Sequence, residues 1–193
     1  MASYAANIVD HLKRLIDCRG RESRADFWPF ALSIIGLSFV AIAAAMIGPM
    51  TDAMRRMQEF ARTHPDQATV TSGPGHYSIQ IEGHHPELMP DFGSMIGGMS
   101  VITVVVVALL AAAVTRRLHD RGWAGFWALV PVALLTSGLL LMPKVMAGDP
   151  PEMRLFFLLF FNNLLYIASL AGLIALLVGG SVQGPNKFGE QPA

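Results

Sequence analysis

Hydrophobic residues in this sequence fall into four long blocks that polar segments separate. The blocks cover about residues 30–50, 94–114, 123–142 and 155–178. An α-helix rises about 1.5 Å per residue, so about 20 residues cross the roughly 30 Å hydrocarbon core of a bilayer. Each block reaches that length. The pattern therefore predicts an all-α membrane protein, a bundle of four transmembrane helices.

The composition supports a membrane protein and argues against several other features. Hydrophobic residues make up 53% of the chain and charged residues only 15%. The formal net charge is zero, so we expect no nucleic-acid partner, which would favour a basic face. Cys18 is the single cysteine, which excludes an intramolecular disulfide. The first apolar block is too long for the core of a cleaved signal peptide, so we expect no cleavage.

A short, highly charged link joins the second and third blocks. Residues 116–127 read RRLHDRGWAGFW, with Arg116, Arg117, His119, Asp120 and Arg121 within six positions. A single arginine at the bilayer centre costs about 2.5–3.5 kcal/mol on insertion scales. The link must therefore lie in water or among lipid headgroups, and the two flanking helices turn back there.

The N-terminal segment has the pattern of an amphipathic helix. Over residues 2–18, apolar side chains such as Ile8 and Leu12 recur at helical spacing, with Asp10 and Lys13 on other faces. Such a helix lies along the membrane surface or packs on the rest of the protein, and the pattern leaves both open. Aromatic residues follow at 27–28, where the first block begins, as is typical of the membrane interface.

Between the first two blocks lies a long polar loop, residues 51–93. Residues 76–82 alternate polar and apolar side chains, the period of a half-buried strand. With 68–72 they are expected to form a β-hairpin in a small extracytoplasmic loop. The four histidines of this loop have no compact metal-ligand spacing, and we expect no metal site; they are His64, His76, His84 and His85.

The distribution of Lys and Arg predicts the orientation in the membrane. Nine lie on the side of the two termini and the charged link, and five lie on the other side. The positive-inside rule therefore places both termini in the cytoplasm. The expected organisation is a cytoplasmic interfacial segment over 1–28, a membrane domain over 29–178 and a cytoplasmic tail over 179–193.

Three residues interrupt the apolar blocks. Asn162 and Asn163 lie within the fourth block, and Pro131 lies within the third, where we expect a kink. Side-chain amides in hydrocarbon seek partners on another helix, each hydrogen bond contributing about 0.6–2 kcal/mol. Two interpretations remain open for the asparagines, as contacts between helices or as part of a polar path for a substrate or proton.

Three further motifs resemble one family. GRESRADFW at 20–28, RRLHDRGWAGFW at 116–127 and GPNKFG at 184–189 are similar, in order and position, to the signatures of the bacterial inner-membrane family called domain of unknown function 805. Trp123, Ala124 and Phe126 depart from the pattern that we expect, as does the long first loop. The resemblance implies the fold and a location in the bacterial inner membrane. It implies no activity, because the family has none established.

All three motifs lie on the predicted cytoplasmic side, so we expect them to meet. We expect Asp120 and Asp26 to neutralise Arg24 and Arg117, with His119 hydrogen-bonded among them and the tail folded beneath through Asn186. The expected interfacial cluster, structural or binding an anion or lipid, is Arg21, Arg24, Asp26, Trp28, Arg116, Arg117, His119, Asp120, Arg121 and Asn186.

Three roles are open for this cluster. It holds the helices in register, binds an anionic headgroup or phosphate through Arg21, Arg116, Arg117 and Arg121, or takes part in catalysis. No nucleotide-binding or zinc motif is present in the sequence. We therefore expect no catalytic residue and no cofactor. The expected function is that of a non-enzymatic membrane protein acting through lipids, a second copy or another membrane protein, with a small transporter or a lipid- or anion-binding protein as the alternative.

Overall fold

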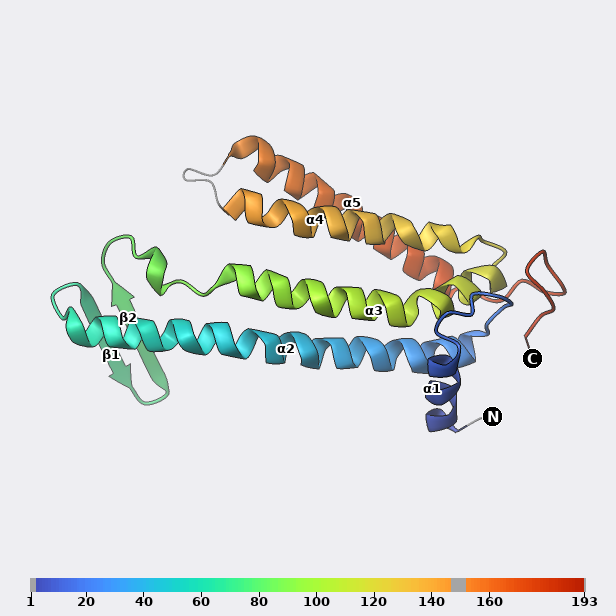
Figure 1. The fold of residues 1–193 in the computed structure, drawn as a ribbon, viewed down its shortest axis with the longest axis horizontal. Helices are drawn as coiled ribbons and strands as arrows, with labels where there is room; N and C mark the ends of the chain where they lie inside the picture. Colours follow the sequence, from blue (N-terminus) through green and yellow to red (C-terminus); the bar gives the residue numbers. More distant parts are fainter. Residues whose placement is uncertain (1–2, 147–151, 193) are drawn as a thin grey trace. The chain divides into compact units, whose positions relative to one another are not determined.

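The computed structural model describes residues 3–146 and 152–192. In chain order the elements are α1 (Tyr4–Lys13), α2 (Arg24–Thr63), β1 (Ala68–Gly73), β2 (His76–Ile81), the short 3-10 helix η1 (Pro86–Leu88), α3 (Phe92–Asp120), the 3-10 helix η2 (Gly125–Ala128), α4 (Leu129–Met146) and α5 (Met153–Val178) (Figure 1). The chain forms two compact units, residues 1–39 with 100–193, and residues 40–99. Helices α2 and α3 contribute to both.

Four helical segments in the described part of the chain are long and apolar enough to cross a membrane, as the sequence predicts. They are Arg24–Thr63, Pro86–Asp120, Gly125–Met146 and Met153–Val178. Each exceeds the length needed to cross hydrocarbon. Most of their apolar side chains are not buried within the protein. Lipid or a neighbouring membrane protein would cover such side chains. The four apolar helices fit a multi-pass integral membrane protein.

Local sequence sets where these helices begin and end. Ser23 caps α2, because its hydroxyl accepts the Asp26 N–H at 3.2 Å. Asp91 caps α3 in the same way, with its carboxylate oxygen 3.1 Å from the Ser94 nitrogen. Gly122 ends α3 in the left-handed region at φ 75°, a conformation that side chains with a Cβ rarely adopt.

The kink predicted at Pro131 is wrong. Pro131 is the third residue of α4, so it lies in the first helical turn. A proline there removes no intrahelical hydrogen bond, because the first-turn N–H groups have no partner inside the helix. The proline in the interior of α4 is Pro143.

In the unit of residues 40–99, β1 and β2 pair as an antiparallel hairpin, from Ala68 opposite Ile81 to Gly73 opposite His76. Gly75 in the turn has φ 75°, which only glycine adopts without strain. Most of the hairpin's side chains are exposed.

The other unit contains the main core. Phe27, Phe30 and Ile34 of α2 pack with Leu118 of α3 and Leu177 of α5. Helix α4 packs along α5 in the same unit (Figure 1). Leu118 belongs to this core, and its sequence neighbours Arg116 and Arg117 are also buried. The aromatic core and the buried arginines are therefore adjacent.

Candidate functional site

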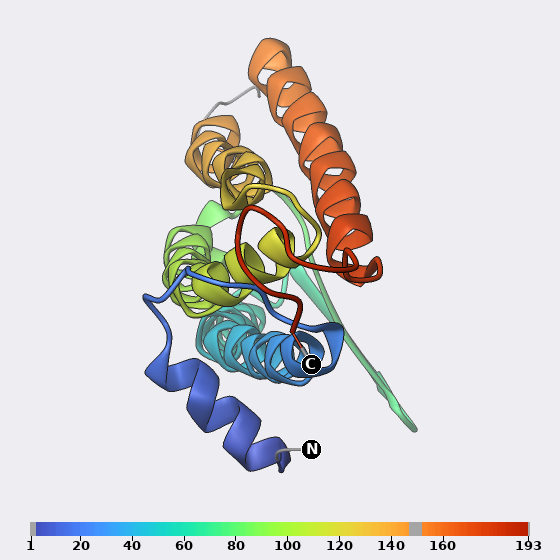
Figure 2. The ribbon, with the colours of Figure 1, turned by 90° about the vertical axis from the view of Figure 1, so that its right-hand side faces the viewer.

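Buried charge gathers where the segment before α2, the end of α3 and the end of α5 meet. The largest fully buried side chains include Arg116 and Arg117, whose exposed fractions are 1% and 0%. We call the set Arg21, Glu22, Arg116, Arg117 and Asp120 the arginine–carboxylate cluster. Figure 2 shows the N-terminal segment and the C-terminal tail lying over this end of α3. A charge is buried only when it is paired, so the partners of each group define the site.

Asp120 joins two arginines from different segments. Its Oδ1 accepts hydrogen bonds from Arg21 Nε at 3.1 Å and Nη2 at 3.0 Å. Its Oδ2 accepts from Arg117 Nη1. All three side chains in these pairs are fully buried. The pair of Asp120 with Arg117 is therefore as predicted, and Arg21 is its second partner.

Glu22 forms the second bridge. Its Oε2 lies 2.7 Å from Arg116 Nε, and its Oε1 lies 2.9 Å from Nε2 of His11. The other ring nitrogen of His11, Nδ1, lies 2.8 Å from the Asn7 carbonyl oxygen. Because both nitrogens face acceptors, the geometry fits the imidazolium form. The ring of Phe30 stacks on His11 with centroids 4.5 Å apart.

The same contacts set the pKa of His11. Burial by itself lowers the pKa, but the hydrogen bonds to Glu22 and to the Asn7 carbonyl outweigh it, so the pKa of His11 lies above its ordinary value of 6.5. His11 is the only buried residue of α1. The hydrogen-bonded ring therefore attaches α1 to the segment before α2.

Arginines also satisfy the C-terminal end of α5. The last carbonyl groups of a helix have no intrahelical partner and carry the negative end of the helix dipole. Here four successive carbonyls, 177–180, each accept from an arginine. Arg117 donates to Leu177 through Nε at 3.0 Å and to Gly179 through Nη2, Arg24 donates to Val178 at 3.5 Å, and Arg121 donates to Gly180.

The C-terminal tail closes over the end of α3. Arg21 donates to the carbonyl oxygens of Val182 and Gly184, each at 2.6 Å. The Asn186 side chain donates to the His119 carbonyl at 2.9 Å, and Phe188 stacks on the His119 ring with centroids 3.8 Å apart. The tail motif thus contacts the charged link at His119. The sequence predicts that these two motifs meet.

His119 itself is held by two neighbouring segments. Its Nδ1 lies 3.2 Å from the Gly20 carbonyl oxygen, so this nitrogen carries the proton in that hydrogen bond. Together with Asn186 and Phe188, Gly20 places the ring between the segment before α2 and the tail.

Two predicted members of the cluster lie elsewhere. Asp26 is exposed and pairs with Ser23, whose hydroxyl donates to its carboxylate at 2.7 Å. The predicted neutralisation of Arg24 or Arg117 by Asp26 is therefore wrong, because Asp26 belongs to the N-terminal cap of α2. Trp28 packs on the apolar core, edge to face with Phe27 at 5.2 Å.

Sequence reasoning missed Glu22 and His11. Both are among the buried polar side chains, at 6% and 5% exposed. A signal for His11 exists in its spacing from Asn7, which places two polar residues one turn apart on α1. Glu22 lies within a predicted motif, but the sequence prediction assigned the pairing with the arginines to Asp26 instead.

The two intramembrane asparagines have different surroundings. Asn162 Nδ2 donates to the Leu134 carbonyl of α4 at 2.9 Å, and its Oδ1 accepts from the Ser137 hydroxyl at 2.6 Å. A Cβ added at Gly138 would lie 3.0 Å from Asn162 Nδ2, so glycine permits this close approach. Asn163 is exposed and donates to the Leu159 carbonyl of its own helix at 3.0 Å.

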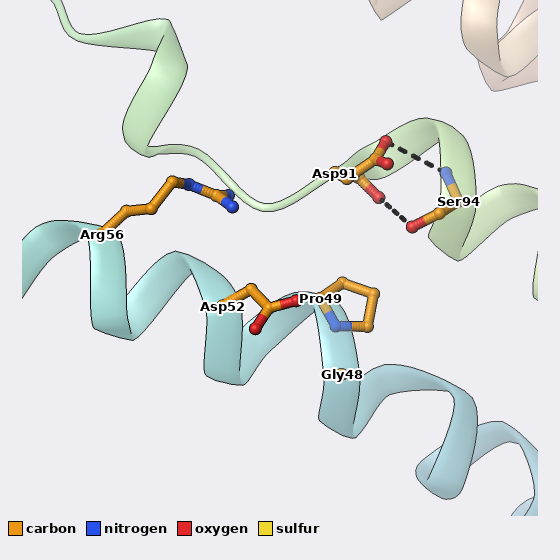
Figure 3. Close-up of a pocket in the computed structure, with 6 residues that line it drawn as sticks. All are labelled: Gly48, Pro49, Asp52, Arg56, Asp91 and Ser94. Carbon is orange, nitrogen blue, oxygen red and sulfur yellow. Dashed lines mark hydrogen bonds between the residues drawn. The ribbon is translucent and has the colours of Figure 1, made fainter.

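The unit of residues 40–99 has an open pocket of about 300 Å³ between α2 and the start of α3 (Figure 3). Arg56 reaches across from α2 and donates to the Met89 carbonyl at 2.8 Å. In the loop, His64 and His85 pack on Phe60 at 4.4 and 4.5 Å between centroids. Within residues 3–146 and 152–192, no three His, Cys, Asp or Glu side chains gather as a metal site would require.

Comparison with protein families identifies the family of this chain. The family described as protein of unknown function (DUF805) matches residues 15–190. That range includes the arginine–carboxylate cluster, the four long helices and the tail motif. No curated protein and no solved structure matches the chain.

Proposed function

The chain belongs to the family of proteins of unknown function (DUF805), and we propose that it is a non-enzymatic integral membrane protein whose arginine–carboxylate cluster fastens its helix ends together. One observation carries this proposal. Arg117 is fully buried, and its donors reach Asp120 on its own helix, the Glu22 carbonyl before α2, and the Leu177 and Gly179 carbonyls of α5. A guanidinium with its donors directed at the chain itself is a structural fastener.

A second role for the cluster has one observation in its favour. Arg121 Nε is buried without a hydrogen-bond partner in the described structure. An anionic headgroup or phosphate would satisfy such a donor. We place this role behind the fastening role because Arg21, Arg116 and Arg117 direct their guanidinium groups at carboxylates and carbonyls of the chain.

We further propose that the protein lies in the bacterial inner membrane, with both termini and the cluster in the cytoplasm and the β1–β2 hairpin outside. The family resemblance supports the location, and the excess of Lys and Arg on the side of the termini supports the orientation.

Among possible partners, we favour a second copy of this chain. Asn163 presents an amide to the surroundings of α5 in the middle of an apolar span, and the same amide on a second copy can both donate and accept. Asn163→Leu is expected to lower the dimer fraction in detergent, measured by light scattering. An unchanged dimer fraction, or a monomeric wild-type protein, would contradict self-association through this face.

The fastening role is tested by a matched pair, Asp120→Asn and Asp26→Asn. Both remove one carboxylate charge, but Asp120 is buried between two arginines and Asp26 is an exposed residue of the α2 cap. Removing one partner of a buried pair costs about 3–5 kcal/mol. We expect Asp120→Asn to lower the melting temperature in detergent sharply and Asp26→Asn to change it much less.

Binding to phosphatidylglycerol vesicles separates the fastener from the anion site. If the cluster held an anion, Asp120→Asn would leave the fold intact and strengthen vesicle binding, because it removes a competing negative charge. Equal melting temperatures for the two variants together with tighter binding by Asp120→Asn would overturn the fastening role.

A further inference from the structure

A groove of about 550 Å³ runs along α5 on the side of α4. Its α5 wall consists of Arg154, Phe157, Leu158, Phe161 and Leu165, at the spacing of a single helical stripe. From Arg154 to Leu165 the helix makes eleven rises of about 1.5 Å, which give a stripe about 16 Å long. The groove therefore extends through roughly half the thickness of a hydrocarbon core.

The uncharged polar side chains in this groove already have hydrogen-bond partners within the protein, so they do not require a polar ligand. Besides the apolar wall it contains Ser137 and Asn162. The Ser137 hydroxyl donates to Asn162 Oδ1, and Asn162 Nδ2 donates to the Leu134 carbonyl. Because these groups satisfy one another, a hydrocarbon chain can lie over them without leaving a buried polar group unpaired.

One end of the groove carries positive charge. Arg154 is the second residue of α5 and is exposed. The Glu152 side chain makes no capping hydrogen bond at this helix end, so the first-turn N–H groups and the guanidinium both favour an anion there. Apolar along its length and cationic at its end, the groove matches the shape and charge of an anionic phospholipid.

We propose that this groove binds one anionic phospholipid, with an acyl chain along Phe157, Phe161 and Leu165 and its phosphate at Arg154. The site lies at the start of α5, whereas the arginine–carboxylate cluster holds the end of the same helix. It is therefore separate from the proposed fastening role, and either can fail without the other.

Native mass spectrometry of the detergent-purified full chain tests the site, with phosphatidylglycerol and phosphatidylcholine of identical acyl chains as probes. Wild-type protein is expected to prefer phosphatidylglycerol. Arg154→Gln should reduce the preference about fivefold, the factor that corresponds to about 1 kcal/mol for one cation at an anionic headgroup. Lys144→Gln is the matched control, because Lys144 is an exposed cation near the end of α4 that does not line the groove.

A second pair of variants tests the acyl chain. Leu158→Trp fills the groove and should release the bound lipid, while Ile167→Trp, similarly exposed on another face of α5, should retain it. Melting curves equal to wild type show that both variants fold. An unchanged preference in Arg154→Gln, an equal loss in Lys144→Gln, or lipid retained by Leu158→Trp would overturn the proposal. Loss of dimerisation in Leu158→Trp would also overturn the proposal, because it would show that a second chain occupies the groove.

Discussion

Glu22 and Asp26 are four residues apart and carry the same charge, yet they have different roles. Glu22 precedes α2 and is buried between Arg116 and His11. Asp26 lies in the first turn of α2, where its carboxylate accepts from Ser23. The sequence contained the signal that separates them, because a serine followed three residues later by an acid is a capping pattern. Applied to Ser23, that pattern would have left Glu22 as the acid for the arginines.

His11 makes the stability of the protein depend on pH. Its pKa is raised in the folded protein, because the hydrogen bonds to Glu22 and Asn7 outweigh burial. A raised pKa contributes stability that is fully present below the unfolded pKa, about 6.5, and is lost as pH rises through the higher folded pKa. We expect the melting temperature in detergent to fall over that rise.

His11→Gln should remove this pH-dependent part of the stability, whereas His84→Gln should keep it, since His84 is exposed in the loop. Melting curves recorded between about pH 5.5 and 9 in one detergent make the comparison. The same pH dependence in His11→Gln as in the wild-type protein would mean that the ring is not held as an imidazolium.

At the scale of elements, the four long helices were predictable because a bilayer demands contiguous apolar residues, and that demand is visible in the sequence. The helix ends were less predictable. Helix α3 continues through the charged link to Asp120, since its arginines find partners in other segments. Pro131 was misplaced because its effect depends on where α4 begins, and η2 over Gly125–Ala128 shifts that start.

The packing of α4 on α5 depends on a glycine. A Cβ at Gly138 would lie 3.0 Å from Asn162 Nδ2, so Gly138→Ala should displace the Asn162 side chain and weaken its hydrogen bonds to Leu134 and Ser137. Overpacking of this kind costs about 1–3 kcal/mol. Gly172→Ala is the matched control, because a Cβ at Gly172 meets nothing within 4 Å. Thermal unfolding in detergent that is equal for both variants would show that close approach at Gly138 does not matter.

At the scale of the whole molecule, the three charged motifs could be predicted to meet and Asp120 to pair with Arg117, but the contacts of Arg21 could not be predicted. Residues 21, 120 and 184 are far apart in sequence, and only the fold brings the Arg21 guanidinium between the Asp120 carboxylate and the Gly184 carbonyl. The use of arginines to satisfy carbonyls 177–180 was also hidden. Backbone acceptors leave no mark in a sequence, so a surplus of arginines over acids is easily taken for an anion site.

The proposed orientation of the chain can be measured with thiol chemistry in intact bacterial cells. Cys18 is exposed and lies in the segment between α1 and α2, and Thr71 is an exposed residue of β1. If the termini are cytoplasmic, a membrane-impermeant maleimide will label Cys18 only after the membrane is disrupted. In a Cys18→Ser background, the Thr71→Cys thiol will be labelled before disruption. Labelling of Cys18 in intact cells would reverse the orientation and place the arginine–carboxylate cluster outside, where the excess of Lys and Arg on that side would contradict the positive-inside rule.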